Sequence, residues 1–157
     1  MSIFFIRGCS GSGKSTLARM MMESYDYKHI EADNYFINDN GVYKFNPDEL
    51  ASAHLLALNL FRKEIYHRGN KAEVIVSNTF TTFKELKKYN DILYNFNIEN
   101  VTILEPQTKW WKDRDANALI NKNVHMVPPQ VILNQLQRYQ PLDAKTYLVK
   151  DLFKILV

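Results

Sequence analysis

A glycine-rich loop near the start of the chain constrains its fold more than any other feature. Residues 8–15 read Gly8-Cys9-Ser10-Gly11-Ser12-Gly13-Lys14-Ser15, followed by Thr16, and they match the P-loop pattern G-x-x-x-x-G-K-[ST] completely. In such a loop, successive backbone N–H groups surround phosphate oxygens, Lys14 reaches the β- and γ-phosphates, and the Ser15 hydroxyl binds Mg²⁺. We therefore predict that residues 8–16 bind a nucleoside triphosphate together with Mg²⁺.

The residues on either side of the loop predict the strand and the helix that a P-loop connects. Residues 3–6 form a continuous apolar run, which is typical of a strand buried on both faces of a parallel sheet. Residues 15–23 contain good helix formers without Gly or Pro, so the loop opens a helix whose N-terminus favours phosphate. A glycine-rich turn without a ligand is the alternative, and this context counts against it.

Strand and helix patterns alternate along the rest of the chain. Further strands are expected at residues 28–32, 74–76 and 101–104, and further helices at residues 47–68, 82–96, 108–119 and 129–139. A last strand or helix is expected at residues 148–156. Behind a P-loop, this alternation predicts a three-layer α/β domain with a central parallel sheet.

Two of these helices carry clear end signals. Asn46 is a good N-cap for the helix at residues 47–68, Pro47 suits its first position, and Gly69 closes it. Residues 82–85 have the form of a capping box at the start of the next helix.

Composition sets broad limits on the kind of protein. With 157 residues, of which 46% are hydrophobic, the chain is expected to form one domain over residues 1–157. Its one cysteine excludes a disulfide framework and a multi-cysteine zinc site, which favours a reducing compartment. No apolar segment reaches the length of a membrane span, and no signal peptide is visible, so we expect a cytoplasmic protein without a membrane partner. The net charge of +3 fits a polyanionic substrate but decides little.

Polar residues follow three of the expected strands, at the sheet edge where ligands bind in such folds. Asp33 follows the second strand and is placed to accept the proton of an attacking hydroxyl, although a turn or helix-cap role is the alternative. Ser77, Asn78 and Thr79 follow the third strand and suit either hydrogen bonds to a substrate or a turn. Glu105 follows the fourth strand, where a solvated carboxylate is favoured.

In order along the chain, several short blocks resemble those of one known family. The blocks are GCSGSGKST, ADNYF, VIVSNT, LEPxTxW, NKNVHMVP and QRY. They look like the P-loop kinase domains related to phage polynucleotide kinase. Similar domains occur in AAA-like ATPase proteins, including a group that binds ubiquitin ligases. The resemblance runs from about residue 3 to residue 139, and only the P-loop block is specific by itself.

The resemblance implies a P-loop fold of the nucleoside and polynucleotide kinase type and transfer of phosphate from ATP to the 5′-hydroxyl of a nucleic acid end. On the matching positions, Asp33 would be the general base, and Asn78 and Thr79 would lie near the acceptor. The block NKNVHMVP resembles the lid segment, so a short helical lid is expected at about residues 110–128. Lys122 would supply lid charge to the phosphates.

The chain also departs from the family at positions that matter for catalysis. Lys122 stands where the family usually has an arginine, and an ammonium cannot reproduce the bidentate contacts of a guanidinium. Met126 replaces the usual lid glycine, and Phe36 occupies the position of an arginine near the acceptor in phage polynucleotide kinase. Arg114 and Arg138 are candidates for the missing guanidinium, with an exposed helix residue as the alternative for each.

Aromatic side chains flank the expected acceptor entrance. Tyr35, Phe36 and Tyr43 follow the second strand, and Trp110 and Trp111 lie near the expected lid. Such side chains stack with nucleobases, and we include Tyr35 and Phe36 among the substrate-binding candidates. Packing in the core is the alternative for each of them.

These observations favour an ATP-dependent kinase that acts on a hydroxyl, with a nucleic acid 5′ end as the acceptor. A kinase of a nucleoside or another small metabolite is one alternative, because the same loop and Asp33 serve that chemistry. A regulatory or interaction protein that binds nucleotide with little or no transfer is the other. No His, Cys, Asp and Glu set has metal-ligand spacing, so the expected metal is Mg²⁺ brought with the nucleotide.

Overall fold

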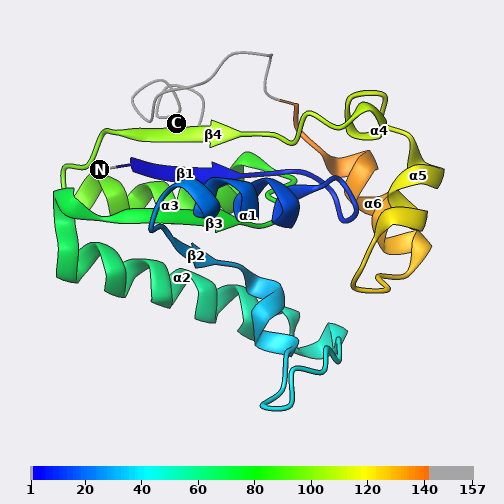
Figure 1. The fold of residues 1–157 in the computed structure, drawn as a ribbon, viewed down its shortest axis with the longest axis horizontal. Helices are drawn as coiled ribbons and strands as arrows, with labels where there is room; N and C mark the ends of the chain where they lie inside the picture. Colours follow the sequence, from blue (N-terminus) through cyan, green and yellow to red (C-terminus); the bar gives the residue numbers. More distant parts are fainter. Residues whose placement is uncertain (1, 142–157) are drawn as a thin grey trace.

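A parallel sheet with strand order β2-β3-β1-β4 forms the centre of the protein (Figure 1). The computed structural model describes residues 2–141, so the element expected at residues 148–156 lies outside the described part. The strands are β1 (Ser2–Ile6), β2 (Lys28–Ile30), β3 (Glu73–Ser77) and β4 (Val101–Leu104). The helices are α1 (Lys14–Ser24), α2 (Leu50–Arg68), α3 (Phe83–Asn95), α4 (Lys109–Lys112), α5 (Ala116–Lys122) and α6 (Pro129–Arg138).

The two central strands, β1 and β3, each contain a continuous apolar run. β1 lies between β3 and β4, with Phe5 in register with Val76 of β3 and Ile103 of β4. Such continuous apolar runs are stable only where both faces of the sheet are covered. β2 lies at an edge of the sheet, and its first residue, Lys28, is exposed.

Helices cover both faces of the sheet. Ala53, Ala57 and Phe61 of α2 pack with residues of α3 in the main core against one face. Ala18 of α1 packs with Ile75 of β3 in a second cluster against the other face. The three-layer α/β architecture predicted from the sequence is therefore confirmed.

The end signals of α2 act as expected, with one refinement. Asn46 caps a single 3₁₀ turn, Pro47–Glu49, by accepting a hydrogen bond from the backbone N–H of Asp48, and the α-helix begins only at Leu50. Gly69 ends the helix with a φ of 49° and donates its N–H to the carbonyl of Ile65. Together these signals set the two ends of α2.

Two sequence expectations about helix starts are wrong in detail. The helix expected at residues 108–119 is split into α4 and α5, because Arg114 adopts a φ of 53° and Asp115 caps the second helix at the N–H of Ala118. The capping box at residues 82–85 does not form with Thr82. The Glu85 carboxylate instead accepts hydrogen bonds from the backbone N–H and the hydroxyl of Thr81, both at 3.0 Å.

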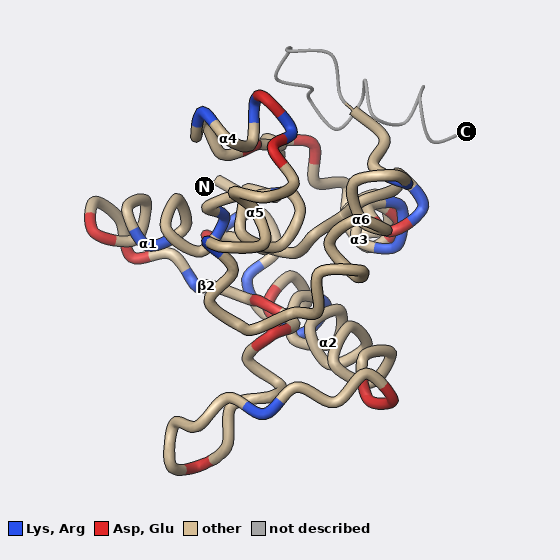
Figure 2. Tube along the Cα trace, turned by 90° about the vertical axis from the view of Figure 1, so that its right-hand side faces the viewer, with Lys and Arg blue, Asp and Glu red and all other residues tan. Residues whose placement is uncertain are grey.

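Residues 110–128, the segment expected to form a lid and called the lid segment or the lid from here on, lie next to the P-loop. Figure 2 looks onto the end of the sheet and shows α4, α5 and α6 gathered there. Cys9, Trp111 and Leu119 are buried together in a small core of their own, apart from the sheet. Within residues 2–141, no helix combines the length and apolarity needed to cross a membrane.

Phe61 makes a testable contribution to stability. Its side chain is fully buried and its ring lies 5.7 Å from Phe5 and 5.2 Å from Tyr89. We expect Phe61→Ala to lower the free energy of unfolding in urea by about 3–5 kcal/mol, because the cavity forms in the main core. The neighbouring Leu60→Ala is the control and should cost far less, since Leu60 is 39% exposed. Equal losses for the two variants would contradict this assignment of the core.

Candidate active site

The P-loop connects β1 to α1 and is held in place by the lid. Gly11 has a φ of 80°, and a Cβ there would overlap the backbone carbonyl oxygen of Leu119 in α5. The indole N–H of Trp110 donates to the Gly11 carbonyl at 2.9 Å, and the Thr108 hydroxyl donates to the Ser12 carbonyl at 2.9 Å. These contacts fix the loop in a shape that only glycine permits at position 11.

The P-loop lysine, Lys14, is buried. It is 9% exposed, and its Nζ donates to the Cys9 carbonyl at 3.0 Å, which leaves two N–H donors for phosphate. Burial lowers the pKa of Lys14, and the nearby carboxylates of Glu31 and Asp33 offset part of that shift. The oxygens of nucleotide phosphates would replace the hydration that this ammonium loses on burial.

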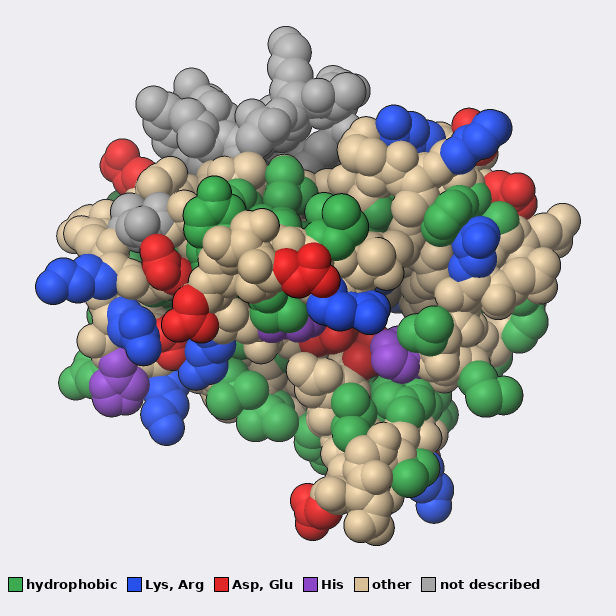
Figure 3. All heavy atoms as spheres, viewed as in Figure 1, with side chains coloured by type: hydrophobic (Ala, Val, Ile, Leu, Met, Phe, Trp, Pro, Cys, Tyr) green, Lys and Arg blue, Asp and Glu red, His purple; other side chains and the backbone are tan. Residues whose placement is uncertain are grey.

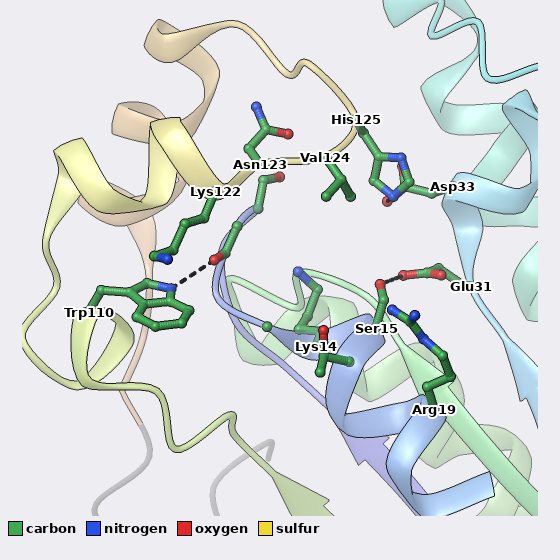
Figure 4. Close-up of a pocket in the computed structure, with 14 residues that line it drawn as sticks. Lys14, Ser15, Arg19, Glu31, Asp33, Trp110, Lys122, Asn123, Val124 and His125 are labelled. Carbon is green, nitrogen blue, oxygen red and sulfur yellow. Dashed lines mark hydrogen bonds and ion pairs between the residues drawn. The ribbon is translucent and has the colours of Figure 1, made fainter. Parts of the chain in front are cut away.

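A cavity of about 270 Å³ lies over the loop, and we call it the nucleotide cavity. Lys14 and Ser15 face it from the P-loop, and Asp33 faces it from the segment after β2 (Figure 4). Lys122 and His125 face it from the lid. On the molecular surface, basic, acidic and histidine side chains gather around a hollow in this region (Figure 3). The structure therefore brings the predicted phosphate ligands and the predicted base to one cavity.

The oxygen donors beside Lys14 suit a magnesium ion. The Ser15 hydroxyl donates to the Glu31 carboxylate at 2.8 Å. Mg²⁺ prefers oxygen ligands and keeps several of its waters, so Ser15 fits a direct ligand and Glu31 fits an acceptor from metal-bound water. Among residues 2–141, no three His, Cys, Asp or Glu side chains gather into a metal site of their own.

Asp33 is held by residues from three other elements. It lies in the 3₁₀ segment η1 (Ala32–Phe36), which is fixed to the end of β3 because the side-chain oxygen of Asn78 accepts from the Ala32 N–H at 2.9 Å. The Tyr43 hydroxyl donates to Asp33 Oδ1 at 3.2 Å. The Nε2 atom of His125 lies 3.8 Å from Asp33 Oδ2. One carboxylate is thus approached from both the β2–α2 segment and the lid.

Tyr43 and His125 form a pair over this carboxylate. Their rings are stacked with centroids 4.4 Å apart. Burial, followed by the Asp33 carboxylate, raises the pKa of Tyr43, so its hydroxyl remains a proton donor to Asp33. From the sequence, Tyr43 is only an aromatic residue near the expected acceptor entrance, and His125 has no assigned role. The two residues are far apart in the chain, so no local sequence pattern indicates that they are in contact.

Three predicted site residues lie elsewhere than expected. Phe36 is 5% exposed and packs in the main core, so its ring does not reach the nucleotide cavity. Arg114 stacks 3.6 Å over the Trp111 ring and lies 3.5 Å from the Glu105 carboxylate, outside that cavity. Asn78 is 5% exposed, and its side-chain oxygen accepts a hydrogen bond from the Ala32 N–H, which positions η1.

The remaining predicted residues take varied positions. Thr79 contacts the P-loop through its backbone, because its carbonyl accepts from the Gly8 N–H at 3.2 Å. Tyr35 is 36% exposed and packs edge-to-face on Phe36. Lys122 faces the nucleotide cavity with its Nζ 4.2 Å from the Trp110 ring centroid. Arg19 of α1 also lines that cavity, although no sequence motif marks it.

The P-loop cysteine is not placed for nucleophilic chemistry. Cys9 is fully buried beside Trp111 and Leu119. Burial raises the pKa of its thiol to about 11, so the reactive thiolate is scarce near neutral pH.

Comparison with known proteins identifies the family and the fold. The sequence model of the AAA domain family matches residues 3–142. Human NEDD4-binding protein 2 is 31% identical over 138 residues, which are 88% of this chain but 8% of that protein. The chain therefore spans a small part of this curated relative.

Solved structures show which kind of P-loop fold this is. A gluconokinase from Sinorhizobium meliloti 1021 superposes with a TM-score of 0.57 at 14% identity, over 89% of this chain and 75% of that chain. A chain of the Pnkp1/Rnl/Hen1 RNA repair complex gives a TM-score of 0.56 at 15% identity, over 87% of this chain and 43% of that chain. The fold is the kinase-like P-loop fold, and these similarities concern the fold alone.

The close fit at Gly11 gives a prediction with an internal control. We expect Gly11→Ala to lower both the melting temperature and the affinity for MgATP, because the added methyl group overlaps the Leu119 carbonyl. Gly41→Ala is the control, since Gly41 has a similar φ of 75° but no atom near its added methyl group. Backbone strain of about 1–2 kcal/mol is common to both variants. Equal melting temperatures and equal ATP affinities in calorimetry would show that the lid does not hold the loop.

Proposed function

We propose that this chain, which belongs to the AAA domain family, is an ATP-dependent kinase that phosphorylates the 5′-hydroxyl of a nucleic acid end. The observation that carries the proposal is the position of Asp33, whose carboxylate faces the same cavity as Lys14 and Ser15. A P-loop alone suits hydrolysis as well as transfer. A carboxylate across from the lysine suits the activation of an acceptor hydroxyl.

The reaction would follow from the positions of these side chains. The P-loop N–H groups and Lys14 would bind the β- and γ-phosphates, and Mg²⁺ at Ser15 would neutralise charge on them. Asp33 would accept the proton of the acceptor hydroxyl as the hydroxyl oxygen bonds to the γ-phosphorus. The bond between the γ-phosphorus and the bridging oxygen of the β-phosphate breaks in the same step. Lys14 and Lys122 would stabilise the charge on the transferring group.

The lid would contribute charge without a guanidinium of its own. Lys122 lies over Trp110, which in turn is hydrogen-bonded to the P-loop, so its ammonium is held near the cavity. Arg19 reaches the same cavity from α1 and supplies a guanidinium from the opposite side (Figure 4). This arrangement supports transfer despite the replacement of the usual lid arginine.

Two lines of support favour a nucleic acid end as acceptor. The sequence blocks resemble those of polynucleotide kinase domains, and the fold is similar to a chain of an RNA repair complex. A small hydroxyl metabolite is the second candidate, because the gluconokinase fold matches most of both chains. Transfer of label from γ-labelled ATP to 5′-hydroxyl DNA and RNA, compared with gluconate, shikimate and nucleosides, separates the two candidates. Labelling of a metabolite with none of the oligonucleotides would overturn the nucleic acid assignment.

Two substitutions test the catalytic assignment. We expect Lys14→Ala to abolish MgATP binding in calorimetry, because the buried phosphate-binding ammonium is lost. We expect Asp33→Asn to retain ATP binding and to lower kcat by about 10²–10⁴, because the proton acceptor is lost. Lys112→Ala and Asp39→Asn remove exposed charges outside the cavity and serve as controls. If Asp33→Asn keeps full transfer activity, Asp33 is not the base and the chain is better described as a nucleotide-binding regulatory protein.

Tyr43 provides a test of how Asp33 is oriented. We expect Tyr43→Phe to lower kcat by about three- to tenfold and to leave the KM for ATP unchanged, because the hydrogen bond from the Tyr43 hydroxyl to the carboxylate is lost. The phenyl ring preserves the stacking on His125, so the melting temperature should stay the same. Tyr25→Phe is the control, since Tyr25 is 64% exposed. An unchanged kcat would remove Tyr43 from the site.

A further inference from the structure

A second and larger cavity lies at the same end of the sheet. It has a volume of about 560 Å³ and lies between α2, α3 and the end of α6. Figure 2 shows α2 lying below α3 and α6 at this end of the molecule. It shares no lining residue with the nucleotide cavity. Its volume falls within the range of small-molecule sites. We call it the acceptor cavity, after the role that we propose for it below.

The interior of the acceptor cavity is mostly apolar. Phe80 and Tyr89, which are almost fully buried, form part of its lining. Leu50, Leu55 and Leu58 of α2 line it as well, and Leu50 and Leu55 are exposed. Aromatic and leucine side chains bind a flat apolar group well and offer few partners to a molecule rich in hydroxyls.

The charged side chains of the cavity favour an anion. Lys88 and Arg138 both line it, and among residues 2–141 neither forms an ion pair. Arg138 Nε donates to the Thr81 hydroxyl at 2.9 Å, which holds the guanidinium beside the cavity. Both oxygens of Glu85 accept hydrogen bonds from Thr81, so that carboxylate already has partners. The cavity lining therefore has two cations, Lys88 and Arg138, and one carboxylate, which already accepts hydrogen bonds from Thr81.

The wall of the cavity is held in an unusual backbone conformation. Phe80 has a φ of 42°, which a non-glycine residue rarely adopts. Its carbonyl accepts two hydrogen bonds from the fully buried Arg7, at 3.1 Å from Nε and 2.8 Å from Nη2. Such conformations persist where the surroundings impose them, and they concentrate at functional sites.

The acceptor cavity adjoins the segment that carries Asp33. Asn78 links the two, because its oxygen accepts from the Ala32 N–H while its nitrogen lies 3.5 Å from the Tyr89 hydroxyl. His54 lines the cavity, and burial lowers its pKa, while the carboxylates of Glu85 and Asp33 act in the opposite direction.

We propose that the acceptor cavity binds the nucleobase of the terminal nucleotide of the acceptor, with Lys88 and Arg138 facing the phosphate that follows it. This inference rests on the proposed function and assigns its substrate class. A nucleobase and a phosphodiester match the apolar lining and the two cations. A neutral polyol would leave the two cations without an anion and would bury hydroxyls against leucine and aromatic side chains.

The test combines substrates and variants. We expect a 5′-hydroxyl oligonucleotide with an abasic first residue to have a KM about tenfold or more above that of the normal oligonucleotide. Ala51→Trp fills the cavity from an exposed position and should raise the KM of the normal oligonucleotide to a similar extent, with the KM for ATP unchanged. Ser52→Trp, at an exposed position outside the cavity lining, is the matched control.

A charge variant gives an independent measurement and needs no change in volume. Lys88→Ala should raise the KM for the oligonucleotide several-fold and lower the salt dependence of that KM, because one phosphate contact is lost. Lys87→Ala is the matched control, since Lys87 pairs with Asp91 outside the cavity. If Ala51→Trp does not fold, Lys88→Ala and the abasic substrate decide the question.

The outcomes separate this inference from the proposed function. Labelling of oligonucleotides with equal KM values for normal and abasic ends, and for Ala51→Trp and wild type, would keep the kinase and overturn the base-binding cavity. If no oligonucleotide is labelled, the fluorescence anisotropy of a dye-labelled 5′-hydroxyl trinucleotide tests binding to the cavity independently of phosphate transfer. Binding by the wild type that Ala51→Trp abolishes and Ser52→Trp retains would support the cavity, and equal binding by all three would overturn it.

Discussion

The buried ammonium of Lys14 is the constraint on which the rest of the site depends. A cation removed from water is costly unless negative groups approach it. Within the P-loop, the Cys9 carbonyl accepts a hydrogen bond from Lys14 Nζ, and further compensation comes from the carboxylates of Glu31 and Asp33 after β2. The parallel order of β1, β3 and β2 brings those carboxylates to the edge of the sheet where the P-loop lies. The groups that offset the charge of Lys14 are therefore also placed for metal and proton chemistry.

A second buried cation organises the other half of the site. Arg7 precedes the P-loop directly and donates to the carbonyls of Phe80 and Gln140, while its guanidinium lies 4.3 Å from the Tyr139 ring centroid. These contacts join the loop after β3 to the end of α6. Because Phe80 lines the acceptor cavity, Arg7, which directly follows β1, links the P-loop to the proposed acceptor site. A change in Arg7 would disturb both cavities together.

Local patterns predicted much of the fold, while the contacts across the site depended on the tertiary structure. The P-loop, the buried strands and the position of Asp33 at a strand end follow from short stretches of sequence. The break at Arg114 did not follow, because a left-handed residue there depends on its stacking over Trp111. Tyr43 and His125 meet over Asp33 from segments about eighty residues apart, and no local pattern records such a meeting.

The replacement of an acceptor arginine by Phe36 has a physical explanation in the proposed substrate site. Phe36 packs into the core against Phe45, where a guanidinium would be buried without a partner. The positive charge for an acceptor phosphate would then have to come from other elements, and in the proposed acceptor cavity Lys88 of α3 and Arg138 of α6 would supply it. These two cations line a cavity that shares no residue with the cavity over the P-loop, so in the proposed complex they would face the next phosphate of a chain. Such a distribution favours an acceptor that continues beyond its first nucleotide over one that ends there.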